Sequence, residues 1–380
     1  MGRTLSREYL RKCISGAKAA AHGGPDCEEL RRMGIADDQV LDFSSNLNPY
    51  GASRLVEEAM RNVSISCYPD RHCVALREAL AAANGLEADN VLPGNGASEL
   101  IHLIARAAQG PVLIAAPTFG EYRHADELAG LTVQEVMAES PNLAFSVDIL
   151  RRAIHRQRPS VVFLCNPNNP SGHYLALEEV GVILHTTRSV GGLLVLDEAY
   201  VDFVPDRWDS VGALGLQGLV ILRSLTKLYG LAGLRLGYIL AKPDLVRALS
   251  TVQPPWSVNA FAQAAGIAAM ADKAHLESSR RALLIERARL ESAIENLGYR
   301  TLPTHTAFFL VRVGNAKRMR ERLLAHNLLV RDCSSFGLPN HIRISARTPE
   351  DGARLIQAMA SESTSGNASV DAEQAPGTKH

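Results

Sequence analysis

Short apolar segments rich in branched aliphatic residues alternate with helical patterns between about residues 50 and 250, and this alternation constrains the fold more than any other feature. The four clearest segments are residues 111–116, 160–165, 192–196 and 219–222. Each is apolar throughout, as expected of strands buried on both faces of a sheet. Because strands that alternate with helices form βαβ units, the sequence predicts an α/β fold whose mostly parallel sheet is flanked by helices.

The length and composition of the chain divide it further. Its 380 residues exceed the size at which a single core stops growing, so a second, smaller α+β domain is predicted after the interruption at Pro254-Pro255-Trp256. The last twenty residues contain too few large aliphatic side chains to offset the entropy of ordering them. The predicted parts are an N-terminal arm that belongs to the small lobe (1–48), a large domain (49–253), a small domain (254–360) and a disordered tail (361–380).

The charge balance and the cysteines exclude several classes of protein. Lys+Arg and Asp+Glu each number 40, so no overall field attracts nucleic acid or anionic lipid. The six cysteines form no C-x-x-C pair and no metal-finger spacing, and no metal site is predicted. No apolar stretch has the length of a membrane span or a signal peptide. We therefore expect a cytoplasmic protein with neither nucleic acid nor a membrane as its partner.

Three polar side chains follow three of the predicted strands. Asn169, Asp197 and Lys227 are separated by 28 and then 30 residues, about one βαβ unit each. Residues just past the carboxyl ends of parallel strands meet at one crevice, where such folds bind ligands. An amide, a carboxylate and an amine are therefore expected to face a common ligand. The alternative is a buried ion pair between the carboxylate and the amine that only supports the sheet.

A phosphate site is predicted beside the same crevice. The glycine turn at residues 94–99 opens an apolar helix, whose first backbone N–H groups are free to bind an anion. Arg235 can add a planar pair of donors, and Ser224 and Thr226 can add hydroxyls. A ligand with a phosphate, a basic ring nitrogen and an aldehyde satisfies all of these groups, and pyridoxal 5'-phosphate has that combination.

The motifs at these strand ends resemble those of the fold-type I pyridoxal-phosphate-dependent aminotransferase superfamily, closest to its histidinol-phosphate aminotransferase branch. They are Asn-Pro-Asn-Asn-Pro-Ser-Gly at 166–172, Asp-Glu-Ala-Tyr at 197–200 and Ser-Leu-Thr-Lys at 224–227, and the resemblance covers residues 42 to about 358. It implies a seven-stranded sheet in the large domain. It also implies that Lys227 is the catalytic residue that carries the cofactor and that Asp197 pairs with the pyridine nitrogen.

The resemblance assigns further residues to the cofactor. Asn169 and Tyr200 are expected to bind the ring hydroxyl, and Phe119 matches the aromatic residue that stacks on the ring. The phosphate is expected to be held by Ala97, Ser98, Ser224 and Arg235, beside the Thr226 hydroxyl named above. On its own, Phe119 also fits a core aromatic residue at a strand end.

Tyr68 resembles a tyrosine that reaches the cofactor phosphate of the neighbouring subunit, which implies a homodimer. Cys67 stands before it, where members of the family usually have arginine.

Three other segments resemble threonine-phosphate decarboxylases. They are His22-Gly23-Gly24, residues 42–51 and residues 255–259. This second resemblance implies decarboxylation of L-threonine O-3-phosphate to (R)-1-amino-2-propanol phosphate for the nucleotide loop of cobalamin, with the arm around His22 closing over the substrate. Taken alone, His22 also fits an exposed turn histidine.

Arginines near the end of the chain offer paired donors to a carboxylate and a phosphate. By resemblance, Arg343 takes the α-carboxylate and Arg331 the side-chain phosphate, with Arg347, His22 and Asn169 nearby. Arg347 fits a surface ion pair equally well. Amino transfer by a histidinol-phosphate aminotransferase stays open as the alternative, because the cofactor site is the same for both reactions. The S-x-x-K spacing of Ser224 and Lys227 also occurs in penicillin-recognising enzymes, but no K-T-G follows.

Overall fold

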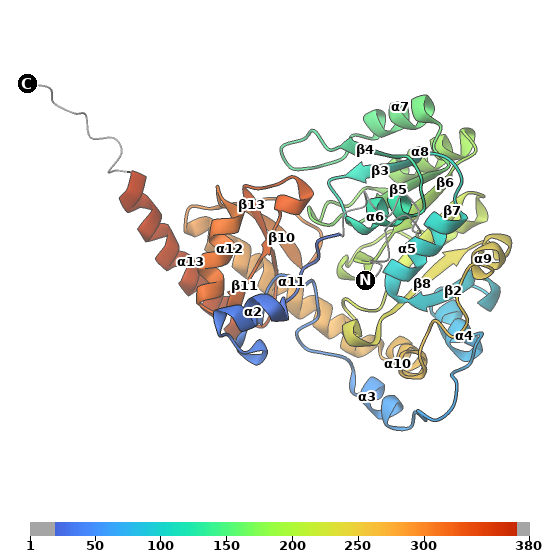
Figure 1. The fold of residues 1–380 in the computed structure, drawn as a ribbon, viewed down its shortest axis with the longest axis horizontal. Coiled ribbons are helices and arrows are strands. Elements are labelled where there is room, and N and C mark those ends of the chain that lie inside the picture. Colours follow the sequence, from blue (N-terminus) through green and yellow to red (C-terminus); the bar gives the residue numbers. More distant parts are fainter. Residues whose placement is uncertain (1–19, 371–380) are drawn as a thin grey trace, which may run out of the picture.

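A computed structural model describes residues 20–370 of the chain, which form a large and a small lobe (Figure 1). The first 19 residues of the predicted arm and the last ten of the predicted tail lie outside the described residues.

The large lobe is built on a seven-stranded sheet in the order β2-β8-β7-β6-β5-β3-β4. Neighbouring strands from β4 through to β7 are parallel, and β8 is antiparallel to both β7 and β2. The mostly parallel α/β sheet predicted from the sequence is confirmed. The strands are β2 (Val91–Asn95), β3 (Val112–Ala116), β4 (Val133–Met137), β5 (Val161–Cys165), β6 (Leu193–Asp197), β7 (Leu219–Ser224) and β8 (Leu236–Ala241).

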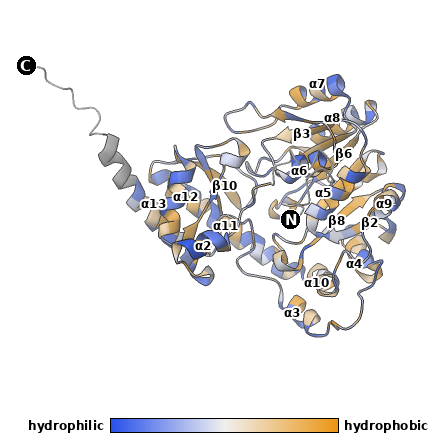
Figure 2. Ribbon diagram, in the orientation of Figure 1, coloured by the Kyte–Doolittle hydropathy of each residue, from blue (hydrophilic) through white to orange (hydrophobic). Residues whose placement is uncertain are grey.

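Successive residues of the central strands enter two different cores, one on each face of the sheet. In β5, Val162 and Leu164 pack into one core, whereas Val161 and Phe163 pack into the other. This follows from the twofold period of a strand and explains why the segments are apolar throughout. Figure 2 shows these hydrophobic strands between helices with hydrophilic outer faces. The helices of the large lobe are α3 (Arg54–Arg61), α4 (Val74–Ala83), α5 (Gly96–Ala107), α6 (Glu121–Leu128), α7 (Val147–Gln157), α8 (Leu177–Ser189), α9 (Pro243–Ser250) and α10 (Ala260–Ala271).

The small lobe contains a four-stranded antiparallel sheet in the order β12-β13-β10-β9, with helices packed against it. A separate parallel pair, β1 with β11, joins the segment before residue 48 to this lobe (Figure 1). Its elements are α2 (Cys27–Met33), β1 (Leu41–Asp42), α11 (Lys273–Asn296), β9 (Arg300–Thr301), β10 (Phe308–Arg312), α12 (Ala316–Ala325), β11 (Leu328–Leu329), β12 (Arg331–Asp332), β13 (His341–Ser345) and α13 (Pro349–Val370).

The predicted start of the small domain at residue 254 falls one helix too early. Ala262 and Ala265 of α10 are fully buried in a large-lobe core, and Gly266 lies tightly against Leu76 and Leu236. The small side chains of α10 allow this close approach. Helix α11 starts anew after α10 at the N-cap Asp272, whose carboxylate accepts the His275 N–H at 3.0 Å.

The predicted disordered tail begins too early as well. Helix α13 extends to Val370, so the first ten residues of that tail are helical. Adding a residue to a helix that is already packed requires much less order than starting a new one. Arg322 of α12 also binds Glu362 with an N–O distance of 2.6 Å. Among residues 20–370, no helix combines the length and the apolar character needed to cross a bilayer.

Candidate active site

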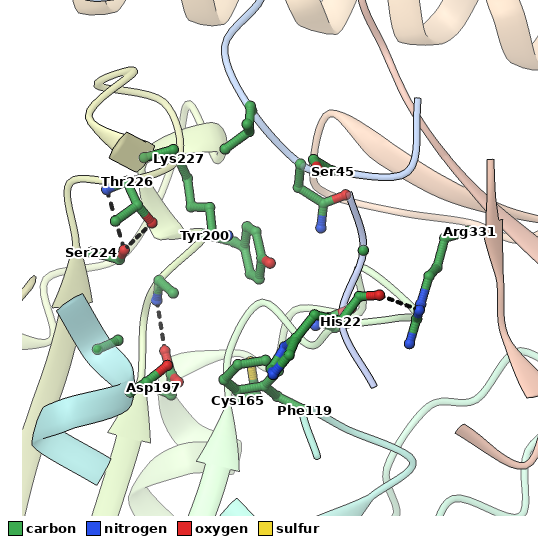
Figure 3. Close-up of a pocket in the computed structure, with 18 of the residues that line it drawn as sticks. His22, Ser45, Phe119, Cys165, Asp197, Tyr200, Ser224, Thr226, Lys227 and Arg331 are labelled. Carbon is green, nitrogen blue, oxygen red and sulfur yellow. Dashed lines mark hydrogen bonds between the residues drawn. The ribbon is translucent and has the colours of Figure 1, made fainter. Parts of the chain in front are cut away.

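A cavity of about 360 Å³ opens where the carboxyl ends of β5, β6 and β7 face the small lobe (Figure 3). Both lobes and the N-terminal arm contribute to its wall. The residues around it include most of those predicted from the sequence: His22, Ala97, Ser98, Phe119, Asn169, Asp197, Tyr200, Ser224, Thr226, Lys227, Arg235, Arg331 and Arg343.

The three predicted strand-end residues meet in this cavity. Asp197 is the last residue of β6, while Asn169 and Lys227 follow β5 and β7. Asp197 and Asn169 are buried, with 2% and 4% of their surfaces exposed. None of the ion pairs within residues 20–370 joins Asp197 to Lys227. The carboxylate and the amine therefore face a shared space and do not neutralise each other directly.

Asp197 is held by two donors from within the protein. The Tyr122 hydroxyl donates to Oδ2 at 2.6 Å, and the backbone N–H of Ala199 donates to Oδ1 at 2.8 Å. Burial raises the pKa of Asp197 to about 6, although the hydrogen bond from Tyr122 opposes that rise. The carboxylate keeps a fixed orientation and remains mostly charged at neutral pH.

Tyr122 was not predicted as a site residue. Its ring is fully buried and stacks on Phe163 at a centroid distance of 4.7 Å, while Phe119 meets it edge-on at 5.7 Å. Its closeness in sequence to Phe119, at the start of α6, was the available signal. The hydrogen bond of the Tyr122 hydroxyl to Asp197 could not be predicted from that closeness.

Lys227 occupies an environment that disfavours a charged amine. Burial, together with the guanidinium groups of Arg343 and Arg235, lowers its pKa to about 8, while Asp197 works in the opposite direction. Its Nζ lies 5.8 Å from the centroid of the Tyr200 ring. A large fraction of this amine is therefore neutral near pH 8 and able to attack a carbonyl carbon.

The first turn of α5 forms one end of the cavity and suits a phosphate. Its N-cap residue, Asn95, makes no side-chain cap hydrogen bond, so N–H groups of the first turn have no capping partner. Gly96 has φ +75°, and a Cβ there would lie 2.8 Å from Nη2 of Arg235. The hydroxyls of Ser224 and Thr226 lie 2.7 Å apart at the end of β7. Donors from α5, Arg235 and β7 thus surround one space.

Two arginines lie beside Phe336 in the wall contributed by the small lobe. Arg331 and Arg343 are directly opposite each other in the antiparallel pair of β12 and β13. Arg343 is 4% exposed; it donates to Asn169 Oδ1 and to the Ser44 carbonyl at 2.7 Å. Its Nε has no hydrogen-bond partner within residues 20–370. Like charges placed opposite each other are unfavourable, so this pair indicates a site for anionic groups.

Two predicted site residues lie elsewhere. Arg347 does not line the cavity: its guanidinium binds Asp351 at 2.9 Å and the Asp42 carbonyl at 3.2 Å. Its predicted place in the substrate site is therefore corrected to that of an ion pair at the start of α13. Tyr68 is 81% exposed and stacks on Trp256 at 4.7 Å, outside the cavity of its own chain.

The sequence did not predict other residues in or beside the cavity. Ser44 and its neighbours line the cavity, and Glu121, outside the lining, forms an ion pair with His22. These contacts depend on which distant segments meet, and the sequence carries no local signal for them.

The comparisons with known proteins match this geometry. The family described as aminotransferase class I and II matches residues 38–359. A histidinol-phosphate aminotransferase of Moorella thermoacetica is 34% identical over 361 residues, which are 92% of each chain. A putative threonine-phosphate decarboxylase of Caldanaerobacter subterraneus is 33% identical over 325 residues, 83% of this chain and 88% of the relative.

A solved structure is also similar over nearly the whole chain. It is the histidinol-phosphate aminotransferase of Sinorhizobium meliloti in complex with pyridoxal-5'-phosphate, which is 25% identical, has a TM-score of 0.87 and covers 95% of this chain and 99% of its own. Three features fit the same cofactor: the first turn of α5, the buried carboxylate of Asp197 and the Lys227 amine, whose pKa is about 8. This chain belongs to the class I and II aminotransferase family and is an enzyme whose cofactor is pyridoxal 5'-phosphate.

Proposed function

We propose that this enzyme decarboxylates L-threonine O-3-phosphate and releases (R)-1-amino-2-propanol phosphate, a building block of the nucleotide loop of cobalamin. The observation that carries the proposal is the pair Arg331 and Arg343, opposed across two strands and facing one cavity. A substrate with both a carboxylate and a phosphate presents one anion to each guanidinium. The arm residue His22 lies beside the same pair and its carbonyl accepts from Arg331.

We assign the cofactor contacts as follows. Lys227 binds the aldehyde carbon, Asp197 keeps the ring nitrogen protonated, Asn169 and Tyr200 bind the ring hydroxyl, and Phe119 covers the ring. The phosphate is held by Ala97, Ser98, Ser224, Thr226 and Arg235. When bound, the cofactor accepts the electron pair of a bond broken at the substrate Cα.

Substrate orientation decides which bond at Cα breaks. The bond that lies perpendicular to the cofactor ring is weakened most, because only its electrons overlap the ring system. Arg331 and Arg343 would fix the two ends of the substrate so that the bond to the carboxylate takes that position. The amine of Lys227, with a pKa of about 8, can then return a proton to Cα.

Amino transfer from histidinol phosphate is the second candidate. It is favoured by the Moorella thermoacetica relative, which is about as similar in sequence as the putative decarboxylase. A substrate with a phosphate but no carboxylate would leave one of the two arginines without an anion.

One experiment separates the two reactions. The holoenzyme is incubated with O-phospho-L-threonine, and CO₂ release is measured with and without a 2-oxo acid acceptor; K227A is the control. Release of CO₂ without an acceptor supports the decarboxylase. Acceptor-dependent transfer from histidinol phosphate, without CO₂ release from phosphothreonine, would replace it with the second candidate.

We also propose that the active enzyme is a cytoplasmic homodimer in which Tyr68 contacts the cofactor phosphate of the partner. Ile65, Tyr68 and Trp256 are 84%, 81% and 42% exposed, and large exposed apolar side chains of this kind are typical of an interface. Light scattering would give a dimer mass for the wild type, and Tyr68→Ala would weaken cofactor binding; a monomeric, fully active enzyme would contradict this.

A further inference from the structure

Glu121 is a buried carboxylate that none of the proposed catalytic steps uses. It is the first residue of α6 and only 7% exposed. Its Oε1 lies 2.9 Å from Nε2 of His22 in the arm, and its Oε2 lies 3.5 Å from Nε2 of His102 in α5. Burying a carboxylate is unfavourable unless its oxygens are paired, so both imidazoles contribute to keeping it there.

The surroundings keep Glu121 charged, and its two oxygens pair with the two histidines. Hydrogen bonds from His102 and His22 lower the pKa of Glu121 to about 2. Beyond His102 lie the His124 ring, edge-on at 6.0 Å, and the fully buried Asp126. Burial raises the pKa of Asp126 to about 7, and neither of its carboxyl oxygens has a hydrogen-bond partner within residues 20–370, so this second carboxyl does not hold the His102 ring.

The main chain of the arm is held from the other lobe. Arg331 donates to the carbonyls of Ala21, at 2.8 Å, and His22. The Gly24 N–H donates to Ser44 Oγ at 2.8 Å, and a Cβ on Gly23 would lie only 2.6 Å from the Ser44 carbonyl oxygen. The arm backbone is therefore bound to the small lobe, as Figure 3 shows for His22 and Arg331, while its imidazole is bound to Glu121 of the large lobe.

We infer that Glu121 is a positioning residue that clamps the arm across the cavity through His22 and sets that imidazole against the phosphate of the substrate. A carboxylate only accepts hydrogen bonds, so its contact fixes a proton on Nε2 of His22. In the doubly protonated ring, Nδ1–H is then the donor left for a phosphate oxygen. Because His22 and Arg331 line the same cavity, a phosphate bound by Arg331 lies within the region that the arm covers. The substrate part of this inference rests on the proposed function; the clamp itself does not.

Hydrogen–deuterium exchange of the holoenzyme without substrate tests the clamp. In E121Q, amides of residues 20–26 are expected to exchange about tenfold faster than in the wild type, because the ionic contact that holds the imidazole is lost. The matched control is E127Q on the same helix: Glu127 binds Arg123 at 3.0 Å, and none of its ion pairs or hydrogen bonds within residues 20–370 involves the arm. Its exchange in residues 20–26 is expected to equal that of the wild type.

A second variant guards against misfolding of E121Q. The His22 side chain is 51% exposed, so H22A leaves the fold intact while removing the donor that contacts Glu121. H22A and the double variant E121Q/H22A are expected to exchange equally fast in residues 20–26, since both lack one shared interaction. Unchanged exchange in H22A, or additive effects in the double variant, would overturn the clamp.

Kinetics test the substrate part. With O-phospho-L-threonine, E121Q is expected to raise KM about tenfold and to change kcat less than about twofold, while E127Q changes neither. A loosened arm with an unchanged KM would overturn the role in substrate capture. Failure of the proposed function would appear differently, as no CO₂ release by the wild type, and would leave the exchange result standing.

Discussion

Replacing Tyr122 with phenylalanine tests how the protein keeps Asp197 charged. The substitution removes the hydroxyl that donates to Asp197 at 2.6 Å and leaves the ring that packs on Phe163, so no cavity is created. A hydrogen bond to a charged group contributes about 1.5–3 kcal/mol, which corresponds to about one to two pH units in the pKa of the carboxyl. The pKa of Asp197, now about 6, should then rise to between about 7 and 8.

The expected loss of cofactor affinity follows from this pKa. At pH 7 the ionised fraction of Asp197 falls from about nine-tenths to between about one-half and one-tenth, so the Kd for pyridoxal phosphate rises about two- to tenfold. The ratio of mutant to wild-type Kd should approach one by about pH 9, where Asp197 is ionised in both proteins. Equilibrium dialysis of the apoenzymes from pH 6 to 9 measures this ratio.

Tyr174→Phe is the matched control. The Tyr174 hydroxyl is buried without a hydrogen-bond partner within residues 20–370, and its ring stacks near Trp208, so the same chemical change occurs away from Asp197. A wild-type Kd for Y122F at pH 7, or a loss that does not change with pH, would refute the reasoning.

Other expected outcomes address the amine, the phosphate turn and a buried ion pair. The rate at which the apoenzyme captures pyridoxal phosphate, followed by stopped-flow absorbance, should rise with pH around a midpoint near 8. Arg343→Gln should move this midpoint upward, because Arg343 lowers the pKa of Lys227. A midpoint near the ordinary lysine value would contradict the role of burial. Gly96→Ala should weaken cofactor binding about tenfold, because its Cβ would meet Arg235. The control Gly130→Ala, also at positive φ but in open space, should cost about 1–2 kcal/mol of stability without changing the Kd for the cofactor. Equal Kd values for the Gly96 variant and the wild type would refute the phosphate assignment. Glu198→Gln should lower the free energy of unfolding, measured in urea, by about 3–5 kcal/mol. The reason is that Arg223, which is 7% exposed and lies 2.9 Å from Glu198, would lose its buried counter-charge. A loss below about 1 kcal/mol would argue against that pairing.

The sheet and the strand-end residues could be predicted because both depend on local patterns. Apolar segments such as residues 161–165 identify strands buried on both faces, and parallel strands bring residues after their carboxyl ends together. Asn169, Asp197 and Lys227 therefore met as expected.

What could not be predicted depends on contacts between distant segments or on where an element ends. The twofold period of β13 would place Arg347 on the same face as Arg343, but the strand ends at Ser345 and Arg347 pairs with Asp351 four residues later. The contact of Tyr122 with Asp197 spans 75 residues and leaves no trace in either local pattern.

The most direct test of the whole account is reduction of the holoenzyme with borohydride, followed by peptide mapping. If Lys227 binds the cofactor aldehyde, the phosphopyridoxyl label should be found on the peptide that contains Lys227 and be absent from K227A. A label on another lysine, or undiminished labelling of K227A, would contradict the account.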